Sequence, residues 1–318
     1  MKKVYVLSVF LLLFSFAEAK IWRVNNNTGI IADFITAQAA HDGAVAGDTL
    51  HFEPSLTSYG GMTMTKRLIL IGVGDFLNIN ANQQASGIAA TLNDFSITNA
   101  GAAGSVIMVS FVYMNISAVS NIVVQRCFIG NRIDGNDADN LVVRNCYFNN
   151  TINIMSGSSN VLFHNNIVRG HLNMDGTSSA TILNNVMGIN GNFTTIYNSI
   201  VRSNILVMGG LGTGINSTLE NNLASDATIP SGNGNQQNVN MTNVFVNHNT
   251  GNDKDLMLKA GSPAIGAGYS GVDAGVFGGA SPYVLSVQPN VPAIYKLNAP
   301  PSVSGSTMTV VISTKSNN

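Results

Sequence analysis

The chain has 318 residues, of which 45% are hydrophobic and 10% are charged, and its formal net charge at pH 7 is −1. The hydrophobic content excludes a disordered protein, and the near-neutral charge argues against nucleic acid or an anionic membrane surface as a partner. With only Cys127 and Cys146, the chain cannot have a disulfide framework. Its 42 asparagines and 32 glycines instead predict many tight turns between short strands.

The N-terminus predicts a cleavable Sec-type signal peptide over residues 1–19. Two lysines precede an uncharged apolar run over residues 4–16, and Ala17 and Ala19 then provide the small residues that signal peptidase requires. The run is too short for a membrane span, and no later stretch is long and apolar enough for one. We therefore expect a mature chain that starts near Lys20 and is secreted or held at the cell surface.

Residues 20–47 are expected to form an N-terminal cap. A helix is predicted within residues 32–45, because Phe34, Ile35 and Ala39 lie roughly on one helical face. Such a capping helix would close one end of the apolar core, which an open solenoid must cover to remain soluble.

A repeat of about twenty residues runs through the middle of the chain and predicts the fold. The segments NIVVQRCFI from Asn121, NLVVRNCYF from Asn140 and NVLFHNNIV from Asn160 align, and weaker copies follow. Each segment has alternating apolar residues, a polar break and a second apolar piece, which is the pattern of short strands with one buried face. One unit cannot bury that face alone, whereas stacked units share a continuous core. We therefore predict an all-β protein with a single-stranded right-handed parallel β-helix over residues 48–279.

One column of the repeat has spacings of 18 to 20 residues and is expected to form an inward ladder. On coils stacked about 4.8 Å apart, each asparagine amide would bond to the residues above and below it. The two cysteines that start the column fit either as buried free thiols or as a bridged pair. The column consists of Cys127, Cys146, Asn166, Asn185, Asn204 and Asn222.

The regular pattern weakens towards the C-terminus. Residues 209–214 and 224–243 are expected to be longer loops, and the last coil should end near Gly279. Five prolines then predict an extended segment over residues 280–318. The alternating run over residues 308–313 could pair along the body of the solenoid.

Outward positions of the repeat contain two columns with basic side chains. Stacking would make these columns adjoining stripes around the middle of the body. A shallow stripe of amides with a few cations suits an extended sugar chain, especially an acidic one, although outward positions need soluble side chains in any case. The first column holds Gln125, Arg144, His164, Leu183 and a displaced Arg202; the second holds Arg132, Thr151, His171 and Asn190, beside Asp134, Asn153, Asn173 and Asn192. The candidate substrate-binding residues are Arg132, Asp134, Arg144, His164 and His171.

Three aspartates in the segment NRIDGNDADN form the best candidate metal site. Asp134, Asp137 and Asp139 could offer oxygen ligands to Ca²⁺, but the segment lacks the EF-hand pattern and aspartate is common in turns. Glycosidase chemistry needs two carboxyl groups about 5 to 9.5 Å apart, and no aligned Asp or Glu pair occurs on neighbouring units. No cofactor is evident, and the sequence identifies no catalytic residue.

Both ends of the repeat resemble a known family. ADFITAQAAHDGAVAGDTLHFEP from Ala32 and GGMTMTKRLILIGVG from Gly60 look like the N-terminal cap and first coils of the pectate-lyase-like right-handed parallel β-helix family. KAGSPAIGAG from Lys259 and VDAGVFGG from Val272 are similar to the closing segment of secreted bacterial β-helix repeat proteins. The resemblance implies the fold, but the family includes polysaccharide lyases, glycoside hydrolases and adhesins, so the fold alone does not assign an activity.

Two functions are therefore carried forward. The first is a secreted or cell-surface solenoid that binds glycans or other surface partners through its side, and the lack of a carboxylate cluster favours it. The alternative is a polysaccharide lyase or glycoside hydrolase that acts on an acidic polysaccharide such as pectate. The family resemblance favours this alternative, and its site would lie around Arg132, Asp134, Arg144 and His171.

Overall fold

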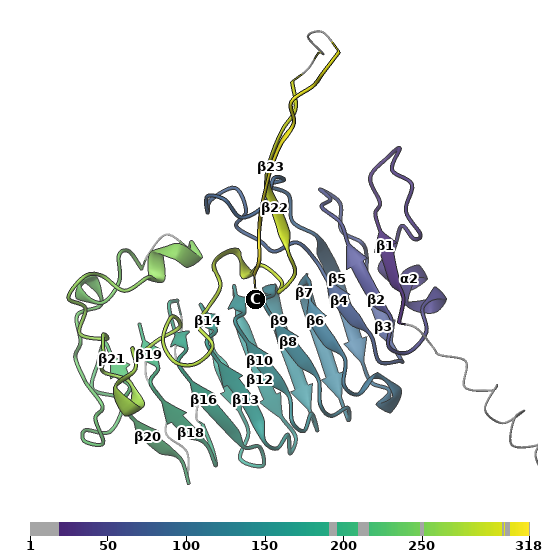
Figure 1. Cartoon of the computed structure of the whole chain (residues 1–318). Helices are drawn as coiled ribbons and strands as arrows, with labels where there is room; N and C mark the ends of the chain where they lie inside the picture. The colour runs from purple at the N-terminus through teal and green to yellow at the C-terminus, as the bar shows by residue number, and fades with distance from the viewer. Residues whose placement is uncertain are drawn as a thin grey trace, which may run out of the picture.

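In the computed structural model, the chain forms a parallel β-solenoid of about nine turns, as the repeat predicted. Figure 1 shows the strands of successive coils side by side, in the order in which they occur in the chain. The structure describes residues 19–190, 196–208, 216–248, 251–300, 302 and 306–317. The loop predicted at residues 209–214 therefore lies outside the described residues, as do residues 1–18 of the predicted signal peptide. Ala19, the last residue of that predicted peptide, is described.

Sheet A forms one side of the solenoid, and every neighbouring pair of its strands is parallel. Within the described residues it has ten strands, in stacking order β1 (Ile21–Val24), β2 (Thr49–Phe52), β4 (Ile69–Ile71), β6 (Val106–Met108), β8 (Val123–Gln125), β10 (Val142–Arg144), β13 (Val161–His164), β16 (Ala180–Leu183), β18 (Ile200–Arg202) and β20 (Thr218–Glu220).

Sheet B forms the opposite side and is also parallel. After a short first strand, its strands are long for three coils and split in later ones, where β12 and β15 continue the polar half of the sheet. In the described part of the chain these strands are β3 (Met62–Met64), β5 (Thr91–Ile97), β7 (Ser110–Ser117), β9 (Phe128–Asn136), β11 (Tyr147–Phe148), β12 (Thr151–Met155), β14 (Ile167–Val168), β15 (Leu172–Met174), β17 (Val186–Met187), β19 (Ile205–Leu206) and β21 (Leu223–Ala224).

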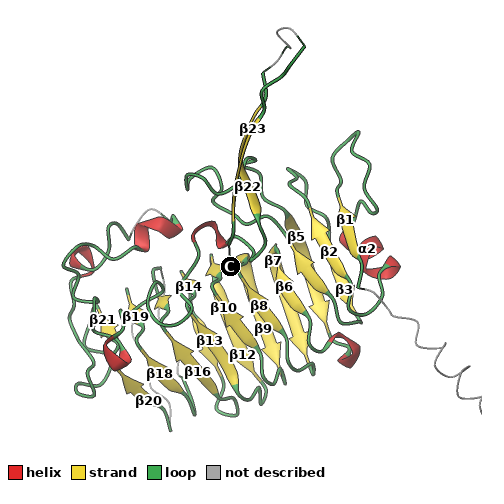
Figure 2. Ribbon diagram, in the orientation of Figure 1, coloured by secondary structure: helices red, strands yellow, loops and turns green. Residues whose placement is uncertain are grey.

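Helices are few and lie outside the sheets (Figure 2). Helix α2 (Ala37–Gly43) falls within the predicted range, and it starts where the Thr36 hydroxyl accepts a hydrogen bond from the Ala39 amide at 3.2 Å. It packs near β1 and β3; that it caps the core stays a prediction. No helix in the described residues is long and apolar enough to cross a membrane. The short 3₁₀ turns are η1 (Ala100–Ala102), η2 (Met241–Asn243), η3 (Asp253–Leu256), η4 (Tyr269–Gly271) and η5 (Leu285–Val287).

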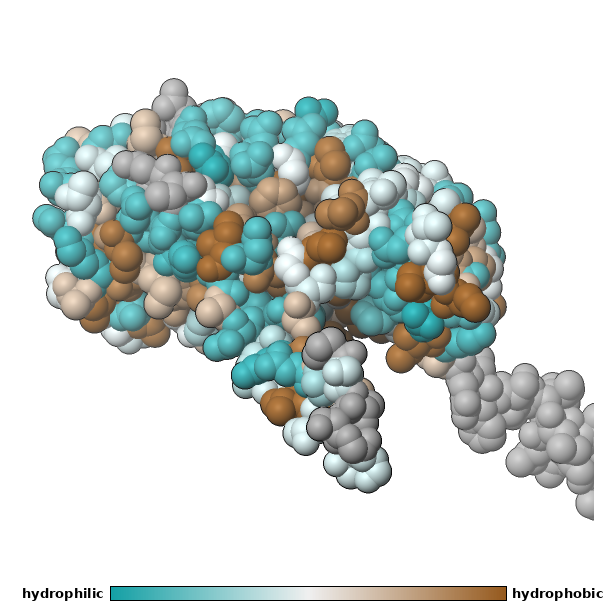
Figure 3. Space-filling model, turned by 90° about the horizontal axis from the view of Figure 1, so that it is seen from above, coloured by the Kyte–Doolittle hydropathy of each residue, from teal (hydrophilic) through white to brown (hydrophobic). Residues whose placement is uncertain are grey.

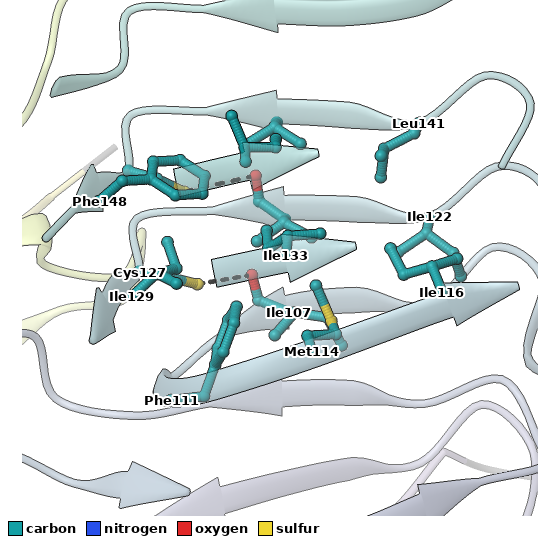
Figure 4. Packing of buried hydrophobic residues seen from close by; sticks show 14 of the residues in the cluster. Ile107, Phe111, Met114, Ile116, Ile122, Cys127, Ile129, Ile133, Leu141 and Phe148 are labelled. Atoms are coloured by element: carbon teal, nitrogen blue, oxygen red, sulfur yellow. Dashed lines mark hydrogen bonds between the residues drawn. The ribbon is translucent and has the colours of Figure 1, made fainter. Parts of the chain in front are cut away.

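The core lies between the two sheets and is built from the inward residues of each coil. Figure 4 shows Ile107 and Ile122 from one side facing Phe111, Met114 and Ile133 from the other. These five side chains are at most 1% exposed. Alternation along each strand places one apolar side chain inside and the next residue outside, so stacked coils bury a continuous apolar column.

The predicted inward ladder is confirmed, and all six of its members are 0% exposed. The Asn185 carboxamide shows the pattern: its oxygen accepts from the Asn166 backbone at 2.8 Å, and its Nδ2 donates to the oxygen of Asn204 at 2.9 Å. The ladder continues one step further than predicted, because Asn222 donates to the side-chain oxygen of Asn235 at 3.1 Å. Cys127 and Cys146 are buried free thiols.

The coils end earlier than the sequence predicted. The last strands of the two sheets, β20 and β21, end at Glu220 and Ala224, and described residues between 239 and 279 add no strand to either sheet. These residues fold back and cover the outer side of the short strands of sheet B. The second apolar cluster formed there joins Tyr147, Ile167, Val186, Ile205 and Leu223 to Met241, Val244, Phe245 and Leu256.

Residues 267–288, here called the strap, then run back along the outside of the coils (Figure 1). The strap follows the turn column, a set of residues with φ between 52° and 58°, each of which precedes a ladder position. The polar side chains of the turn column bond to the strap in reverse order along the stack. These residues are Asn221, Ser203, Asn184, Asn165, Asn145 and Arg126, which contact Ala267, Tyr269, Asp273, Val276, Ser281 and Gln288 respectively.

After the strap, β22 (Ala293–Asn298) and β23 (Val311–Lys315) form an antiparallel pair. This hairpin stands off the body instead of lying along it (Figures 1 and 3). The prediction that residues 308–313 pair along the solenoid is therefore wrong, because the partner of that run is β22.

Candidate functional site

The five candidate binding residues lie on two different surfaces. Arg132 and Asp134 belong to β9, and His171 immediately precedes β15, so these three lie on the outer side of sheet B. Arg144 and His164 are direct neighbours on the outer side of sheet A. The two predicted stripes are thus separated by the turn between the sheets, and the structure does not bring the five side chains into one cluster.

The outer side of sheet B across β5, β7, β9, β12 and β15 is here called the polar face. Its strands pair in register, so outward side chains form columns with one residue from each coil. Five coils at about 4.8 Å each give the columns a length of about 20 Å. One column contains Ser96, Asn115, Asp134, Asn153 and Asn173, and the other contains Asp94, Tyr113, Arg132 and Thr151. Asn192, predicted to extend the first column, lies outside the described residues.

Asp134 is the centre of the hydrogen bonds on the polar face. Its carboxylate accepts from the Tyr113 hydroxyl at 2.9 Å, from Arg132 Nε at 3.0 Å and from Asn153 Nδ2 at 2.5 Å. Asn173 continues the chain by donating to the Asn153 oxygen at 2.8 Å. The Arg132 guanidinium lies 5.2 Å from the centre of the Tyr113 ring. These contacts hold the side chains of four strands in fixed positions.

The same contacts keep Asp134 ionised. Partial burial opposes ionisation, but the hydrogen bonds from Asn153, Tyr113 and Arg132 outweigh it and lower the pKa of the Asp134 carboxyl. The pKa of the Tyr113 hydroxyl is raised, first by partial burial and then by its bond to this carboxylate. At neutral pH the face therefore presents an aspartate and an arginine that neutralise each other, among hydroxyl and amide groups.

A hollow of about 440 Å³ opens at the N-terminal end of the polar face. Its lining combines Gln38 from α2 with Thr63, Asp94, Tyr113 and Asn115 from three strands of sheet B. Amides, hydroxyls, one carboxylate and one aromatic ring are the groups that hydrogen-bond to and stack on a hydroxyl-rich ligand.

The polar face offers little for glycosidase chemistry. Its two carboxylates, Asp94 and Asp134, are two strands apart and two residues out of register, so their backbone positions are about 12 Å apart. Known pairs need about 5 to 9.5 Å between the carboxyl groups. Asp134 is also engaged by three donors at once, which disfavours a role as a proton donor.

The three aspartates of the candidate Ca²⁺ site do not lie together in one loop. Asp134 lies within the nine-residue strand β9, whereas Asp137 and Asp139 follow it in the turn. The Asp139 carboxylate instead accepts from the Ser159 amide and hydroxyl of the next coil, at 2.8 and 2.6 Å. Within the described ranges, no three His, Cys, Asp or Glu side chains gather where they could hold a metal ion.

On sheet A, Arg144 and His164 belong to the predicted column. Gln125, Arg144, His164 and Leu183 are in register, and Arg202 continues the column directly instead of being displaced. Arg144 Nε donates to the Gln125 side-chain oxygen at 2.8 Å. Burial lowers the pKa of the His164 imidazole. The hydrogen bond from His164 Nδ1 to the Asn165 oxygen raises this pKa, and the charge of Arg144 lowers it, so the net shift favours the neutral imidazole.

The sequence did not identify two important contributors. Tyr113 supports both Arg132 and Asp134, but it lies in β7, before the repeat becomes legible as aligned segments. The strap-binding asparagines were visible only as the first members of Asn-Asn pairs such as Asn165 and Asn166. The first member of each pair has a positive φ, which asparagine tolerates. An asparagine just before a ladder position was therefore the available signal in the sequence for an outward side chain.

Comparison with protein-family models gave no match, and searches of curated proteins and of solved structures gave no significant relative.

Proposed function

We propose that this protein is a glycan-binding solenoid, whose ligand lies along the polar face. The observation that carries the proposal is the pair of in-register columns, in which one polar side chain follows another at the coil spacing over up to five strands, mostly hydroxyls, amides and carboxylates with the single Arg132. An extended polysaccharide has a similarly repeated pattern of hydroxyl donors and acceptors. The hydrogen-bonded chain from Tyr113 through Asp134 to Asn173 holds these groups in place before binding, which reduces the entropy lost on association.

Binding to immobilised neutral and acidic polysaccharides, including polygalacturonate and alginate, tests the proposal. We expect one class to be retained by the wild-type protein, and we expect Arg132→Ala to weaken that binding about tenfold, because it removes one charge-assisted donor and releases Asp134 from its partner. The matched control is Arg67→Ala, which removes an exposed arginine away from the polar face. Equal retention of the wild type and Arg132→Ala would contradict the proposal.

The same incubations distinguish binding from catalysis. A lyase would release unsaturated sugars and a hydrolase would release reducing ends, with or without added Ca²⁺. The pectate-lyase-like resemblance supports such an activity, while the separation of Asp94 and Asp134 and the engagement of Asp134 disfavour it. Turnover by the wild-type protein would replace the binding-only assignment.

We also propose that the protein is exported. The support is the sequence before Lys20, with its two lysines, apolar run and small residues at Ala17 and Ala19. Expression of the full chain in a bacterial host should place the protein outside the cytoplasm, with an N-terminus near Lys20 by Edman sequencing. An intact N-terminus on cytoplasmic protein would contradict export.

A further inference from the structure

A groove of about 280 Å³ lies between sheet A and the C-terminal segment, at the level of β8 and β10. Sheet A contributes Gln125 and Arg144, the turn column contributes Arg126 and Asn145, and the far side consists of residues between 280 and 290. This groove is on a different sheet from the polar face. Its volume is close to the lower end of the range for small-molecule sites, about 300 Å³.

The Arg144 side chain is held in place with its outer end open to the groove. Its Nε donates to the Gln125 oxygen at 2.8 Å, and Gln125 is itself 8% exposed, with its Nε2 3.1 Å from the sulfur of Met108. Among the hydrogen bonds of the described residues, Arg144 donates through Nε alone. The two terminal nitrogens of the guanidinium therefore remain available to a ligand.

A second cation reinforces this one. Arg126 is half-buried beside the groove and donates to the carbonyl oxygens of Gln288, at 3.2 Å, and of Asn317. Both acceptors are neutral, so its charge is not compensated by them. Burial lowers the pKa of the Arg126 guanidinium, and the nearby charge of Arg144 lowers it further.

Negative charge is missing from the groove wall. The described lining residues include no Asp or Glu, and residues 274–318 contain none in the sequence. Two arginines without a carboxylate partner, in a partly enclosed space, attract an anion more strongly than exposed arginines do.

We propose that this groove binds an oxyanion, a carboxylate or sulfate group carried by a ligand about the size of one sugar residue. The open end of Arg144 provides the planar pair of donors that such a group accepts in a bidentate geometry, and Arg126 adds a second positive charge behind it. Asn145 is already occupied, since its Nδ2 donates to the Ser281 carbonyl at 2.9 Å. The site is independent of the polar face, and either one can fail without the other.

Calorimetric titration of the full chain at constant ionic strength tests the groove. The probes are glucuronate, glucose 6-sulfate and, as the uncharged control, glucose. We expect at least one anionic sugar to bind saturably and glucose not to bind. We expect Arg144→Ala to weaken the affinity for the anionic sugar at least tenfold. Comparison of the two anionic probes shows whether carboxylate or sulfate is preferred.

Two further variants complete the experiment. Arg144→Lys keeps the charge without the planar pair of donors, so its affinity should fall between those of the wild type and Arg144→Ala. Arg67→Ala should bind the probe as the wild type does, since Arg67 lies outside the groove. Unfolding temperature is measured for each variant, and a folded Arg144→Ala with wild-type affinity would overturn the proposal. Absence of saturable binding by both anionic sugars, or equal binding of glucose, would also overturn it.

Discussion

A buried asparagine in this solenoid forms hydrogen bonds with polar groups in the core, which an apolar residue cannot do. Asn185 accepts from the Asn166 backbone and donates to the Phe163 carbonyl and the Asn204 oxygen, all inside the core. Backbone groups at a turn in the interior would otherwise lack partners, and each unpaired buried group costs about 1–3 kcal/mol. The ladder therefore allows a turn to be repeated in every coil without exposing it to water.

Replacing Asn185 with alanine should lower the free energy of unfolding by about 3 kcal/mol, because the Asn166 backbone N–H and the Phe163 carbonyl both lose their bond to the Asn185 side chain, while the Asn204 oxygen keeps the Asn185 backbone N–H. Thermal and urea unfolding of the variant measure the loss. The control is Asn150→Ala, an exposed asparagine that donates to the Asn131 side chain at 3.3 Å, for which we expect a change below about 0.5 kcal/mol. Similar losses in the two variants would show that the buried ladder is not special.

Spacing made the inward ladder predictable residue by residue, up to Asn222. Asn235 was missed because it follows Asn222 after 13 residues, which breaks the period. Alternation also placed Arg132, Asp134, Arg144 and His164 on the outside. Alternation does not reveal on which sheet an outward residue lies, because that depends on where each coil turns. The sequence therefore did not predict that Arg144 and Arg132 lie on different sheets.

At the scale of elements, the strap is held by side chains and not by strand pairing. Asn165 donates to two strap carbonyls, those of Val276 and Gly278, at 2.9 and 2.8 Å. Asn184 repeats this with Asp273 and Gly275 in the next coil. Because the strap's carbonyls bind in sequence along the turn column, its position is fixed at each coil that it crosses.

Asn165→Gly should loosen the strap while leaving the coil intact. Glycine adopts the positive φ of this position, 52°, without strain, so the change removes the two hydrogen bonds to the strap, worth about 1–3 kcal/mol together, and the contact of the Asn165 oxygen with His164 Nδ1. Hydrogen exchange should quicken in residues 273–283. In Asn160→Gly, an exposed position with φ of 56° that faces away from the strap, exchange there should be unchanged. Unaltered strap exchange in Asn165→Gly would refute this account.

Two elements of the C-terminal segment differ from the expectation for physical reasons. The run over residues 308–313 has the period of a strand, but a period does not identify the partner, which is β22. Residues 239–279 carry apolar residues that resemble the inward positions of a coil. They are instead buried against outward residues such as Ile167 and Val186. Consecutive apolar pairs in the short strands, such as Ile167-Val168, were the signal that both faces are covered.

At the scale of the whole molecule, the parallel β-solenoid could be predicted from the sequence because one pattern recurs in coil after coil. In a solenoid each coil contacts mainly its neighbours, so stability is close to a sum of neighbouring interfaces. The strap departs from this rule, since it connects the coil of Asn221 with that of Arg126 on the outside. Coils that do not touch one another are thereby coupled through a single segment.

This coupling has a consequence for the order of assembly. The docking partners of the strap are spread over six successive coils, and the strap follows all of them in the chain. Coils can form one after another from the N-terminal side as neighbouring contacts become available, whereas the strap gains its full set of contacts only when the last coil is in place. We therefore expect strap docking to be a late step of folding, and we expect a misaligned coil to leave part of the strap undocked.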